Sequence, residues 1–323
     1  MRILVTGAAG FIGSHYVRSL LGGAYDGHDK TEVTVLDNLT YAGNQANLAV
    51  VADGPRYDFV KGDIADAALV NDLMPGHDVV VHFAAESHVD RSIEAAADFV
   101  RTNVVGTQTL LDAALRTGVE RFVHVSTDEV YGSIDEGSWT EDSPLLPNSP
   151  YSASKASSDL FARAFWRTHR LPVIITRCSN NYGPYQFPEK VIPLFVTNLM
   201  DGLTVPLYGD GLNVRDWLHV DDHCQGVQLA LESGSPGEIY NIGGGTELTN
   251  RELTERLVEA MGVGWDRVTP VQDRPGHDRR YSVDDTKLRR LGYEPRHSLD
   301  QGLAETIEWY RSNESWWRPL KHG

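Results

Sequence analysis

Short runs of apolar and β-branched residues alternate with helix-like patterns through the first half of the chain. The runs that predict strands are Ile3–Thr6, Val33–Asp37, Asp58–Lys61, Val79–Phe83, Arg121–Ser126 and Pro172–Thr176. Between them, apolar residues recur at spacings of three and four in Phe11–Leu21, Ala97–Ala114 and Ser152–Trp166, as in helices that cover a sheet. Buried strands separated by helices predict a parallel sheet with right-handed crossovers and helices on both faces. Ligands of such sheets bind at the carboxyl ends of the strands.

The pattern changes after about residue 181, where glycine-rich turns separate shorter elements. Leu248–Met261 and Ser298–Ser312 are predicted helices, the first with Thr249 or Asn250 as its N-cap. The run Ile239–Ile242 predicts a strand that returns to the main sheet. We therefore expect an α/β protein with a Rossmann-type, doubly wound parallel sheet and a smaller α/β C-terminal substrate lobe. The expected first domain is 1–181 with a return segment of about 218–243, and the second is 182–217 with 244–323.

Directly behind the first predicted strand, glycines stand at positions 7, 10 and 13. In a dinucleotide site, Gly7 permits the tight turn, Gly10 lets the backbone approach a pyrophosphate and Gly13 allows close packing of the helix. The N-terminus of that helix offers free N–H groups to the phosphates. Asp37 ends the second predicted strand, where a carboxylate bonds ribose hydroxyls and repels a 2′-phosphate, so the pattern indicates NAD rather than NADP. The alternatives are a glycine-rich turn without a ligand and an ordinary turn aspartate.

Two more strand ends offer groups to the same ligand. Asp63 follows the third predicted strand and can accept a hydrogen bond from an adenine amino group, or serve in a turn. Phe83-Ala84-Ala85 follows the fourth and supplies the small residues that a backbone close to a cofactor requires.

Tyr151 and Lys155 stand four residues apart, which places them on one face of a predicted helix. A lysine ammonium beside a phenol lowers the pKa of the phenol. The phenolate then takes a proton from a substrate hydroxyl as hydride leaves the same carbon. Ser126 and Thr127 follow the fifth predicted strand at the same, ligand-binding edge of the sheet.

Together, the glycine motif, the Ser/Thr pair after the fifth strand and the Tyr-x-x-x-Lys spacing resemble the extended short-chain dehydrogenase/reductase family that acts on nucleotide sugars. The resemblance covers essentially the whole chain. It implies a bound NAD, and the residues expected to bind it are Gly7, Gly10, Phe11, Ile12, Gly13, Asp37, Asn38, Thr40, Asp63, Ile64, Phe83, Ala84, Ala85, Thr102, Tyr151, Lys155 and Asn181.

Two adjacent carboxylates, Asp128 and Glu129, follow Thr127. A simple alcohol dehydrogenase or a 4-epimerase needs neither, whereas an acid and a base are needed when a proton leaves carbon and a hydroxyl leaves as water. A solvated acidic loop is the alternative. Within the family, Thr127-Asp128-Glu129 resembles the signature of the branch that dehydrates dTDP-glucose. The resemblance implies that the catalytic residues are Thr127, Asp128, Glu129, Tyr151 and Lys155.

The implied reaction has three steps on one bound NAD. C4 of glucose is oxidised with Tyr151 as the base, and water then leaves across C5 and C6, with Glu129 taking the C5 proton and Asp128 protonating the departing hydroxyl. Hydride finally returns to C6 and a proton to C5, so NAD stays bound as a prosthetic group. Asp128 must start protonated, which requires a pKa raised by burial and by its acidic neighbour. The rival hypotheses are a UDP-sugar 4,6-dehydratase, a nucleotide-sugar 4-epimerase and a non-catalytic NAD-binding regulator.

Stretches in the second half of the chain resemble the segments with which the family binds the nucleotide. Arg215 suits a diphosphate because its planar guanidinium bonds phosphate oxygens in pairs. Residues 273–281 form a basic island in an acidic chain, for which a solvated Pro-Gly turn is the alternative. The expected substrate-binding residues are Ser87, Thr127, Asn180, Lys190, Val191, Pro206, Tyr208, Arg215, Asn250, Arg274 and His277.

Charge and composition limit the partners and the compartment. The net charge of −16 argues against nucleic acid or an anionic membrane as the main partner. No apolar stretch approaches the roughly 20 residues that span a bilayer, and Met1–Val5 opens into a predicted strand with no signal sequence before it. The two cysteines, Cys178 and Cys224, lie far apart, so we expect no disulfide and a cytoplasmic location.

Three further patterns concern metal, the tail and self-association. We expect no metal at His219 and His223, because Asp222 between them is better used as a helix N-cap. The Trp316-Trp317 pair is predicted to anchor the tail by packing. The two helices through which family members dimerise correspond to Ala97–Ala114 and Ser152–Trp166, so a homodimer is expected. Their surplus apolar residues are Phe99, Val100, Val104, Leu111, Leu160, Phe161 and Phe165.

Overall fold

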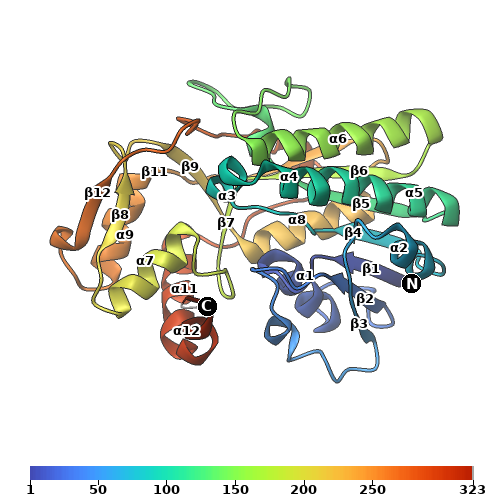
Figure 1. Ribbon diagram of the computed structural model, residues 1–323, viewed down its shortest axis with the longest axis horizontal. Helices are drawn as coiled ribbons and strands as arrows, with labels where there is room; N and C mark the ends of the chain where they lie inside the picture. The colour runs from blue at the N-terminus through green and yellow to red at the C-terminus, as the bar shows by residue number, and fades with distance from the viewer. Residues whose placement is uncertain (322–323) are drawn as a thin grey trace.

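A seven-stranded parallel sheet forms the centre of the protein, as a computed structural model describing residues 1–321 shows (Figure 1). The strand order is β10-β6-β5-β4-β1-β2-β3. The strands are β1 (Arg2–Thr6), β2 (Glu32–Asp37), β3 (Tyr57–Lys61), β4 (Val79–His82), β5 (Arg121–Thr127), β6 (Val173–Cys178) and β10 (Ile239–Ile242). The predicted Rossmann-type sheet is confirmed, and the predicted return strand pairs with β6, with Ile239 opposite Ile175.

Alternate side chains of each strand enter two separate cores. On β1, Ile3 and Val5 pack on one face with α1 (Phe11–Leu21) and α8 (Val220–Ser233), whereas Leu4 packs on the other. That second face is covered by α2 (Ala67–Leu73), α5 (Thr107–Thr117) and α6 (Pro150–His169). Strands buried on both faces explain the nearly continuous apolar runs of the sequence.

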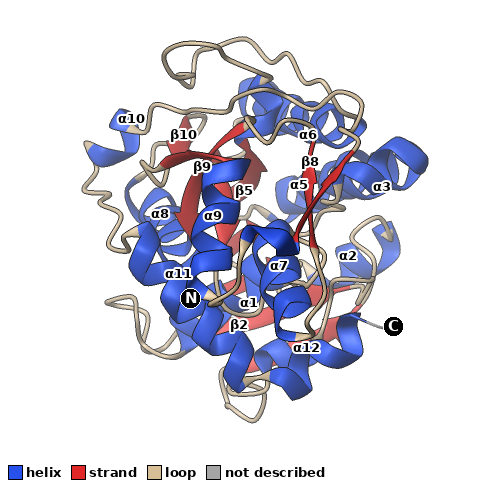
Figure 2. Ribbon diagram, turned by 90° about the vertical axis from the view of Figure 1, so that its left-hand side faces the viewer, coloured by secondary structure: helices blue, strands red, loops and turns tan. Residues whose placement is uncertain are grey.

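A smaller lobe lies beyond the carboxyl ends of the strands (Figure 1), and it stands in front of the main sheet when the molecule is turned by 90° (Figure 2). It contains a three-stranded sheet of β11 (Glu247–Thr249), β9 (Val214–His219) and β7 (Asn180–Tyr182), and a pair formed by β12 (Val268–Val271) and β8 (Val205–Tyr208). Its helices are α7 (Val191–Met200), α9 (Asn250–Ala260), α11 (Leu299–Ser312) and α12 (Glu314–Lys321). The remaining elements are α3 (Val89–Glu94), α4 (Ala96–Phe99), α10 (Thr286–Arg289) and the 3-10 helices η1 (Gln45–Leu48), η3 (Asp128–Tyr131) and η4 (Trp265–Arg267).

The predicted helix Ser152–Trp166 is part of the longer α6, and two other predicted helices differ more from the structure. The span Ala97–Ala114 is not one regular helix, because the π-helix η2 (Val100–Gly106) separates α4 from α5. Within it, the Asn103 side chain bonds both the N–H and the carbonyl of Glu86, a contact that the sequence does not reveal. The other helix, α9, begins at Asn250 rather than Leu248, with the predicted N-cap Thr249 joined to Glu252 in a capping box.

No helix within residues 1–321 is both long and apolar enough to cross a membrane.

A buried ion pair links α6 to β6 beneath the ligand-binding edge of the sheet. The Arg177 Nε lies 2.8 Å from the Asp159 Oδ2, and His124 contacts the other carboxylate oxygen at 3.2 Å. Burial acts to raise the pKa of Asp159, but Arg177 and His124 outweigh it and lower this pKa to about 2. The pair therefore contributes stability above the ordinary carboxyl pKa of 3.8, and that contribution is lost as the pH falls through about 2.

Replacing Asp159 with Asn is expected to destabilise the protein by about 3 to 5 kcal/mol at pH 7, because Arg177 is left buried without a counter-charge. Urea unfolding at pH 7 and at lower pH values measures both the loss and its decline in acid. Asp112→Asn is the control, since its ion pair with Arg116 lies on the surface and is worth at most about 1 kcal/mol. Equal losses in the two variants would contradict the prediction.

Candidate active site

One large cavity lies at the carboxyl ends of the central strands, and its lining also includes Asn181 and Lys190 from the smaller lobe. Its lining includes all five predicted catalytic residues and every residue expected to bind NAD, from Gly7 to Asn181. The lining segments follow β1, β2, β3, β4, β5 and β6, which meet at one edge because the strands are parallel.

The glycine-rich turn between β1 and α1 is as tight as its motif predicts. Gly7 has φ of 71°, and a Cβ there would lie 2.4 Å from the backbone nitrogen of Ala84. A Cβ on Gly13 would lie 2.6 Å from the carbonyl oxygen of Gly7. Neither position therefore accepts a side chain. The N-terminus of α1 has no side-chain cap, so its N–H groups remain available to an anion at the cavity.

Asp37 and Asp63 both line the cavity but differ in their partners. Asp37 accepts hydrogen bonds from the N–H groups of Ala9 at 2.9 Å and Leu39 at 2.8 Å, which hold its carboxylate beside the glycine-rich turn. Burial raises the pKa of Asp37, and these two bonds oppose that effect. Asp63 accepts from the N–H of Ala65, so the turn role that the sequence left open is realised.

Several of the described residues in the lining carry buried polar atoms without hydrogen-bond partners. Within the part of the chain that the structure describes, Asp128 Oδ2, Ser179 Oγ, Asn180 Oδ1 and Gln186 Oε1 are buried and lack a hydrogen-bond partner. All four residues line the cavity. Buried polar groups are normally hydrogen-bonded, so this lining suits a ligand rich in hydroxyl and amide groups. The tight glycine-rich turn, the Asp37 carboxylate expected to bond a ribose and these polar atoms together fit a dinucleotide.

The tyrosine and lysine come from the start of α6. Ser149 and Ser152 form a capping box with Pro150 at the first helical position, and this cap places Tyr151 in the first turn. One turn later the Lys155 Nζ donates to the carbonyl of Val125 at 2.8 Å. Burial lowers the pKa of Lys155 to about 8.

The sequence predicts a lowered pKa for Tyr151, but the groups of the protein itself raise this pKa. Burial raises the pKa of Tyr151 well above its ordinary value, and Glu129 and Cys178 act in the same direction, while a hydrogen bond with Thr127 opposes them. Desolvation is therefore the largest influence on the Tyr151 pKa in this cavity.

Asp128 and Glu129 have contrasting surroundings although they are adjacent. Asp128 is 2% exposed, and burial raises its pKa well above the ordinary value, with Glu129 and Asp216 adding to the effect. Burial also raises the pKa of Glu129, but three cations, Arg274, Arg215 and Lys190, oppose that rise. The pair can therefore hold one proton on Asp128 while Glu129 ionises, which is the arrangement that an acid and a base require.

The predicted substrate-binding residues fall into two groups. Ser87, Thr127, Asn180 and Lys190 line the cavity. Val191, Pro206, Tyr208, Arg215, Asn250, Arg274 and His277 lie outside its lining. Among these, Arg215 and Arg274 still oppose the rise in the Glu129 pKa, whereas His277 lines a second, more open cavity with Asn148 and Gly276. Pro206 and Tyr208 lie on β8, and Asn250 begins α9.

Some lining residues were not singled out from the sequence. Tyr41 lies in the loop after β2, packs edge-on against Phe187 at 5.7 Å between ring centroids, and has the Arg91 guanidinium 3.9 Å from its ring centre. Glu86, Cys178 and Gln186 also line the cavity. Tyr41 and Glu86 stand next to the predicted residues Thr40 and Ser87, which is the one sequence signal for them, whereas no predicted site residue adjoins Cys178 or Gln186.

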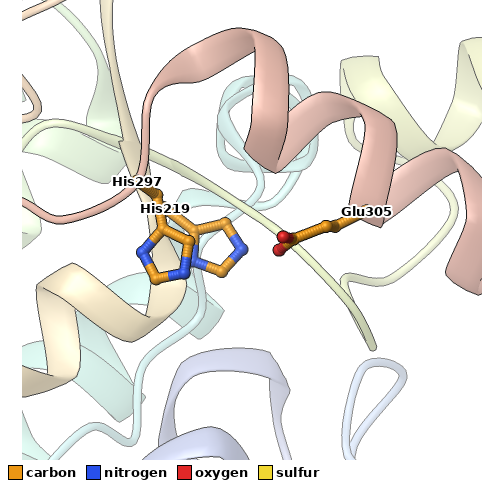
Figure 3. A group of neighbouring side chains, drawn as sticks. All are labelled: His219, His297 and Glu305. Carbon is orange, nitrogen blue, oxygen red and sulfur yellow. The ribbon is translucent and has the colours of Figure 1, made fainter.

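A histidine cluster lies between β9 and α11 (Figure 3). Candidate ligand atoms of His219, His297 and Glu305 lie within 4.8 Å of one another. The two rings, however, are stacked with centroids 4.0 Å apart and an interplanar angle of 25°. The in-plane lone pairs of stacked rings point side by side, so they do not converge on one ion. The His219 Nδ1 also accepts from the N–H of Asp221, which leaves the proton of a neutral ring on Nε2.

The expected N-cap at this helix is wrong. His219, not Asp222, caps α8, because β9 runs directly into the helix. The Asp222 carboxylate instead accepts from the N–H groups of Arg296 and His297, and so holds the segment before α11. His223 bonds the Asn181 side chain at 2.9 Å.

The fold and the cavity define a class of enzyme, the short-chain dehydrogenases/reductases that combine a dinucleotide fold with a Tyr-x-x-x-Lys helix. The chain belongs to the GDP-mannose 4,6 dehydratase family, whose model matches residues 4–306. It is 67% identical over 323 residues to the dTDP-glucose 4,6-dehydratase of Streptomyces antibioticus, covering 99% of this chain and 96% of that protein.

Solved structures agree with this family. DesIV, the dTDP-glucose 4,6-dehydratase of Streptomyces venezuelae with NAD and TYD bound, matches with a TM-score of 0.97 at 65% identity, covering 99% of this chain and 100% of that one. The dTDP-glucose 4,6-dehydratase of Bacillus anthracis str. Ames in complex with NAD matches with a TM-score of 0.92 at 49% identity, covering 99% of both chains.

Proposed function

We propose that this protein is a dTDP-glucose 4,6-dehydratase, which converts dTDP-glucose to dTDP-4-keto-6-deoxyglucose and water with tightly bound NAD. The observation that carries the proposal is the pair Asp128 and Glu129 beside Tyr151 in the cavity where a dinucleotide fits. Full-length similarity to enzymes of this activity supports it.

The residues of the cavity divide the chemistry among them. NAD, when bound, accepts hydride from C4 of the sugar and later returns it to C6, while a proton returns to C5. The glycine-rich turn and the N-terminus of α1 hold its pyrophosphate, and Asp37 bonds its ribose. Tyr151 takes the proton of the C4 hydroxyl, with Lys155 as the nearby ammonium. Because the chain's own groups raise the pKa of Tyr151, this step needs the positive charge of the oxidised nicotinamide beside the phenol.

Elimination uses the two carboxyl groups in different protonation states. Glu129 removes the C5 proton, which a ketone at C4 makes acidic, and the cations Arg274, Arg215 and Lys190 favour its ionised form. Asp128 begins protonated because it is buried beside Glu129, and it donates its proton to the departing C6 hydroxyl. The hydroxyl of Thr127 donates to the Asp128 Oδ1 at 3.2 Å and so orients that group.

Two of the three rival functions lack a use for this pair. A 4-epimerase needs a base and a hydride acceptor, which Tyr151, Lys155 and NAD already supply, so Asp128 would have no role. A non-catalytic regulator would need none of the four titratable groups. A UDP-sugar 4,6-dehydratase shares the chemistry and differs only in the base of the nucleotide.

The test is to incubate the purified protein with dTDP-glucose, without added cofactor, and to analyse the sugar nucleotide by mass spectrometry. Loss of one water without accumulating NADH is expected. An unchanged mass, also after adding NAD⁺, would contradict the proposal, and formation of the galacto epimer or turnover of UDP-glucose instead would favour a rival.

The division of the chain follows from this function. We place NAD in the domain formed by 1–181 with about 218–243, and the sugar nucleotide in 182–217 with 244–323. The pairing of β10 with β6 and the packing of α8 on the main sheet support the discontinuous boundary. A cytoplasmic location is part of the same proposal, supported by two buried cysteines that form no disulfide.

We also propose a homodimer formed through α6 and the helical segment before it. Leu160 is 55% exposed and Phe161 41% exposed on α6, and Ile93, Val100 and Val105 are exposed on α3 and η2, which pack against α6. Phe99 and Leu111, two of the residues expected on this surface, are instead buried within the chain. An exposed apolar patch of this kind marks a protein interface, and a second copy of α6 would cover it.

Leu160→Glu combined with Phe161→Glu is expected to convert the dimer to a monomer at micromolar concentration. Each buried side chain of this size contributes about 1.5 to 3 kcal/mol, and an interfacial carboxylate adds a desolvation cost. Multi-angle light scattering of the wild type and the variant measures the change. Val50→Glu, at an exposed residue outside the patch, serves as the control. A monomeric wild type at this concentration would refute the dimer.

A further inference from the structure

The C-terminal helix reaches the glycine-rich turn through one buried asparagine. Asn47, in η1, is 2% exposed. Its Nδ2 donates to the carbonyl of Ala9 at 2.8 Å, and its Oδ1 accepts from the indole Nε1 of Trp316 at 2.8 Å. Ala9 lies between Gly7 and Gly10 in the turn that faces the cavity. A side chain of α12 is therefore two hydrogen bonds away from this turn.

The Ala9 peptide depends on these bonds for its orientation. Its N–H donates to Asp37 at 2.9 Å, and its carbonyl accepts from the N–H of Asn44 as well as from Asn47. Because Ala9 is buried, a lost bond to its carbonyl is not simply replaced by water. Changing Asn47 would therefore shift both the turn and the Asp37 carboxylate attached to it.

Aromatic and cationic neighbours hold the Trp316 ring in place. Its centroid lies 5.5 Å from that of Tyr185 and 5.0 Å from that of Trp309, both in edge-on arrangements. The Arg18 guanidinium of α1 lies 4.1 Å from the Tyr185 ring centre and donates to the carbonyl of Asn47 at 2.6 Å. The cluster thus joins α11 and α12 to α1 and η1, on the side of the smaller lobe that faces the first strands (Figure 1).

We propose that Trp316 and Asn47 are positioning residues for the cofactor, and that the Trp316–Asn47–Ala9 contacts slow the release of NAD by holding the glycine-rich turn in shape. The inference rests on the proposed function, because a redox-neutral reaction requires NAD to remain bound through the cycle. It means that a side chain of the substrate-binding lobe contributes to retention of the cofactor by the other domain.

The test compares two neighbouring tryptophans in the purified holoenzyme. Trp316→Phe removes the indole N–H and keeps an aromatic ring. Trp317→Phe is the matched control, because its Nε1 donates to the carbonyl of Tyr310 within the same lobe. The rate of NAD dissociation is measured by exchange with labelled NAD⁺. One lost hydrogen bond predicts release about three- to tenfold faster for Trp316→Phe and unchanged for Trp317→Phe, with kcat normal for both at saturating NAD⁺.

Asn47→Asp is a second variant that keeps the acceptor for Trp316 but places an oxygen against the Ala9 carbonyl. Its NAD release should be faster than that of Trp316→Phe, and it decides the question if Trp316→Phe does not fold. Release at the wild-type rate in the folded variants would overturn the inference, as would a loss of kcat that saturating NAD⁺ does not restore. Failure of the wild type to dehydrate dTDP-glucose would count against the proposed function, whereas the release rates decide this inference separately.

Discussion

Tyr151→Phe is expected to reduce kcat for dehydration of dTDP-glucose by about 10² to 10⁴-fold, the usual contribution of a positioned proton-transfer group. The phenol is the one group proposed to take the C4 hydroxyl proton, and without it the first step has no base. The ring stays in place, since Tyr151 packs edge-on against Phe99 and is buried. Single-turnover assays, followed by mass spectrometry of the product, measure the loss.

The control is Tyr240→Phe, which removes a hydroxyl that accepts from the N–H of Ser235, and neither residue lines the cavity. Its kcat should remain near that of the wild type, although its stability falls. Retained NAD in Tyr151→Phe, measured after denaturation, distinguishes a chemical defect from loss of the cofactor. If Tyr151→Phe turned over within tenfold of the wild type, the assignment of the base would be wrong.

Asp128→Asn is expected to reduce the loss of water by about 10² to 10⁴-fold while oxidation at C4 continues. An amide matches the carboxyl group in shape but cannot supply the proton that the C6 hydroxyl needs. The expected sign is an accumulation of reduced nicotinamide on mixing with substrate, which the wild type does not show. Stopped-flow absorbance measures it.

The pH profile gives an independent readout of the same group. Burial and Glu129 raise the pKa of Asp128, so the acid is present at low pH and is lost as the pH rises through that raised value. The wild-type rate of water loss should therefore decline on the alkaline side, and Asp128→Asn should lack that limb. Asp135→Asn, an exposed aspartate on the following loop, should behave as the wild type. Full dehydration by Asp128→Asn would contradict the proposed acid.

The central sheet was predictable because its signals are local. Strands buried on both faces need continuous apolar runs, and α1 needs its apolar spacing, so the predicted range Phe11–Leu21 matches the structure. The capping box of Thr249 and Glu252 and the N-cap of α11 at Ser298 likewise depend only on residues close together in the sequence. The cavity lining could be anticipated for the same reason, since parallel strands bring their carboxyl ends to one edge.

Features set by long-range contacts were not predictable from the sequence. Asn103 in the π-helix η2 forms hydrogen bonds with Glu86, which lies before α3. Asp222 accepts hydrogen bonds from the backbone of residues 296–297 and does not cap its own helix. The raised pKa of Tyr151 depends on burial by segments far apart in the chain, which no spacing of residues reports.

The sequence by itself determined the alternation of strands and helices, the glycine-rich turn and the residues that stand at the strand ends. Each follows from periodicity, capping or backbone conformation within a few residues. Only the tertiary structure decided that Arg274, Arg215 and Lys190 lower the pKa of Glu129 and do not lower that of Asp128 equally. It also decided that Trp316 contacts the glycine-rich turn through Asn47. Desolvation and charge depend on which atoms surround a group in three dimensions, and those atoms come from every part of the chain.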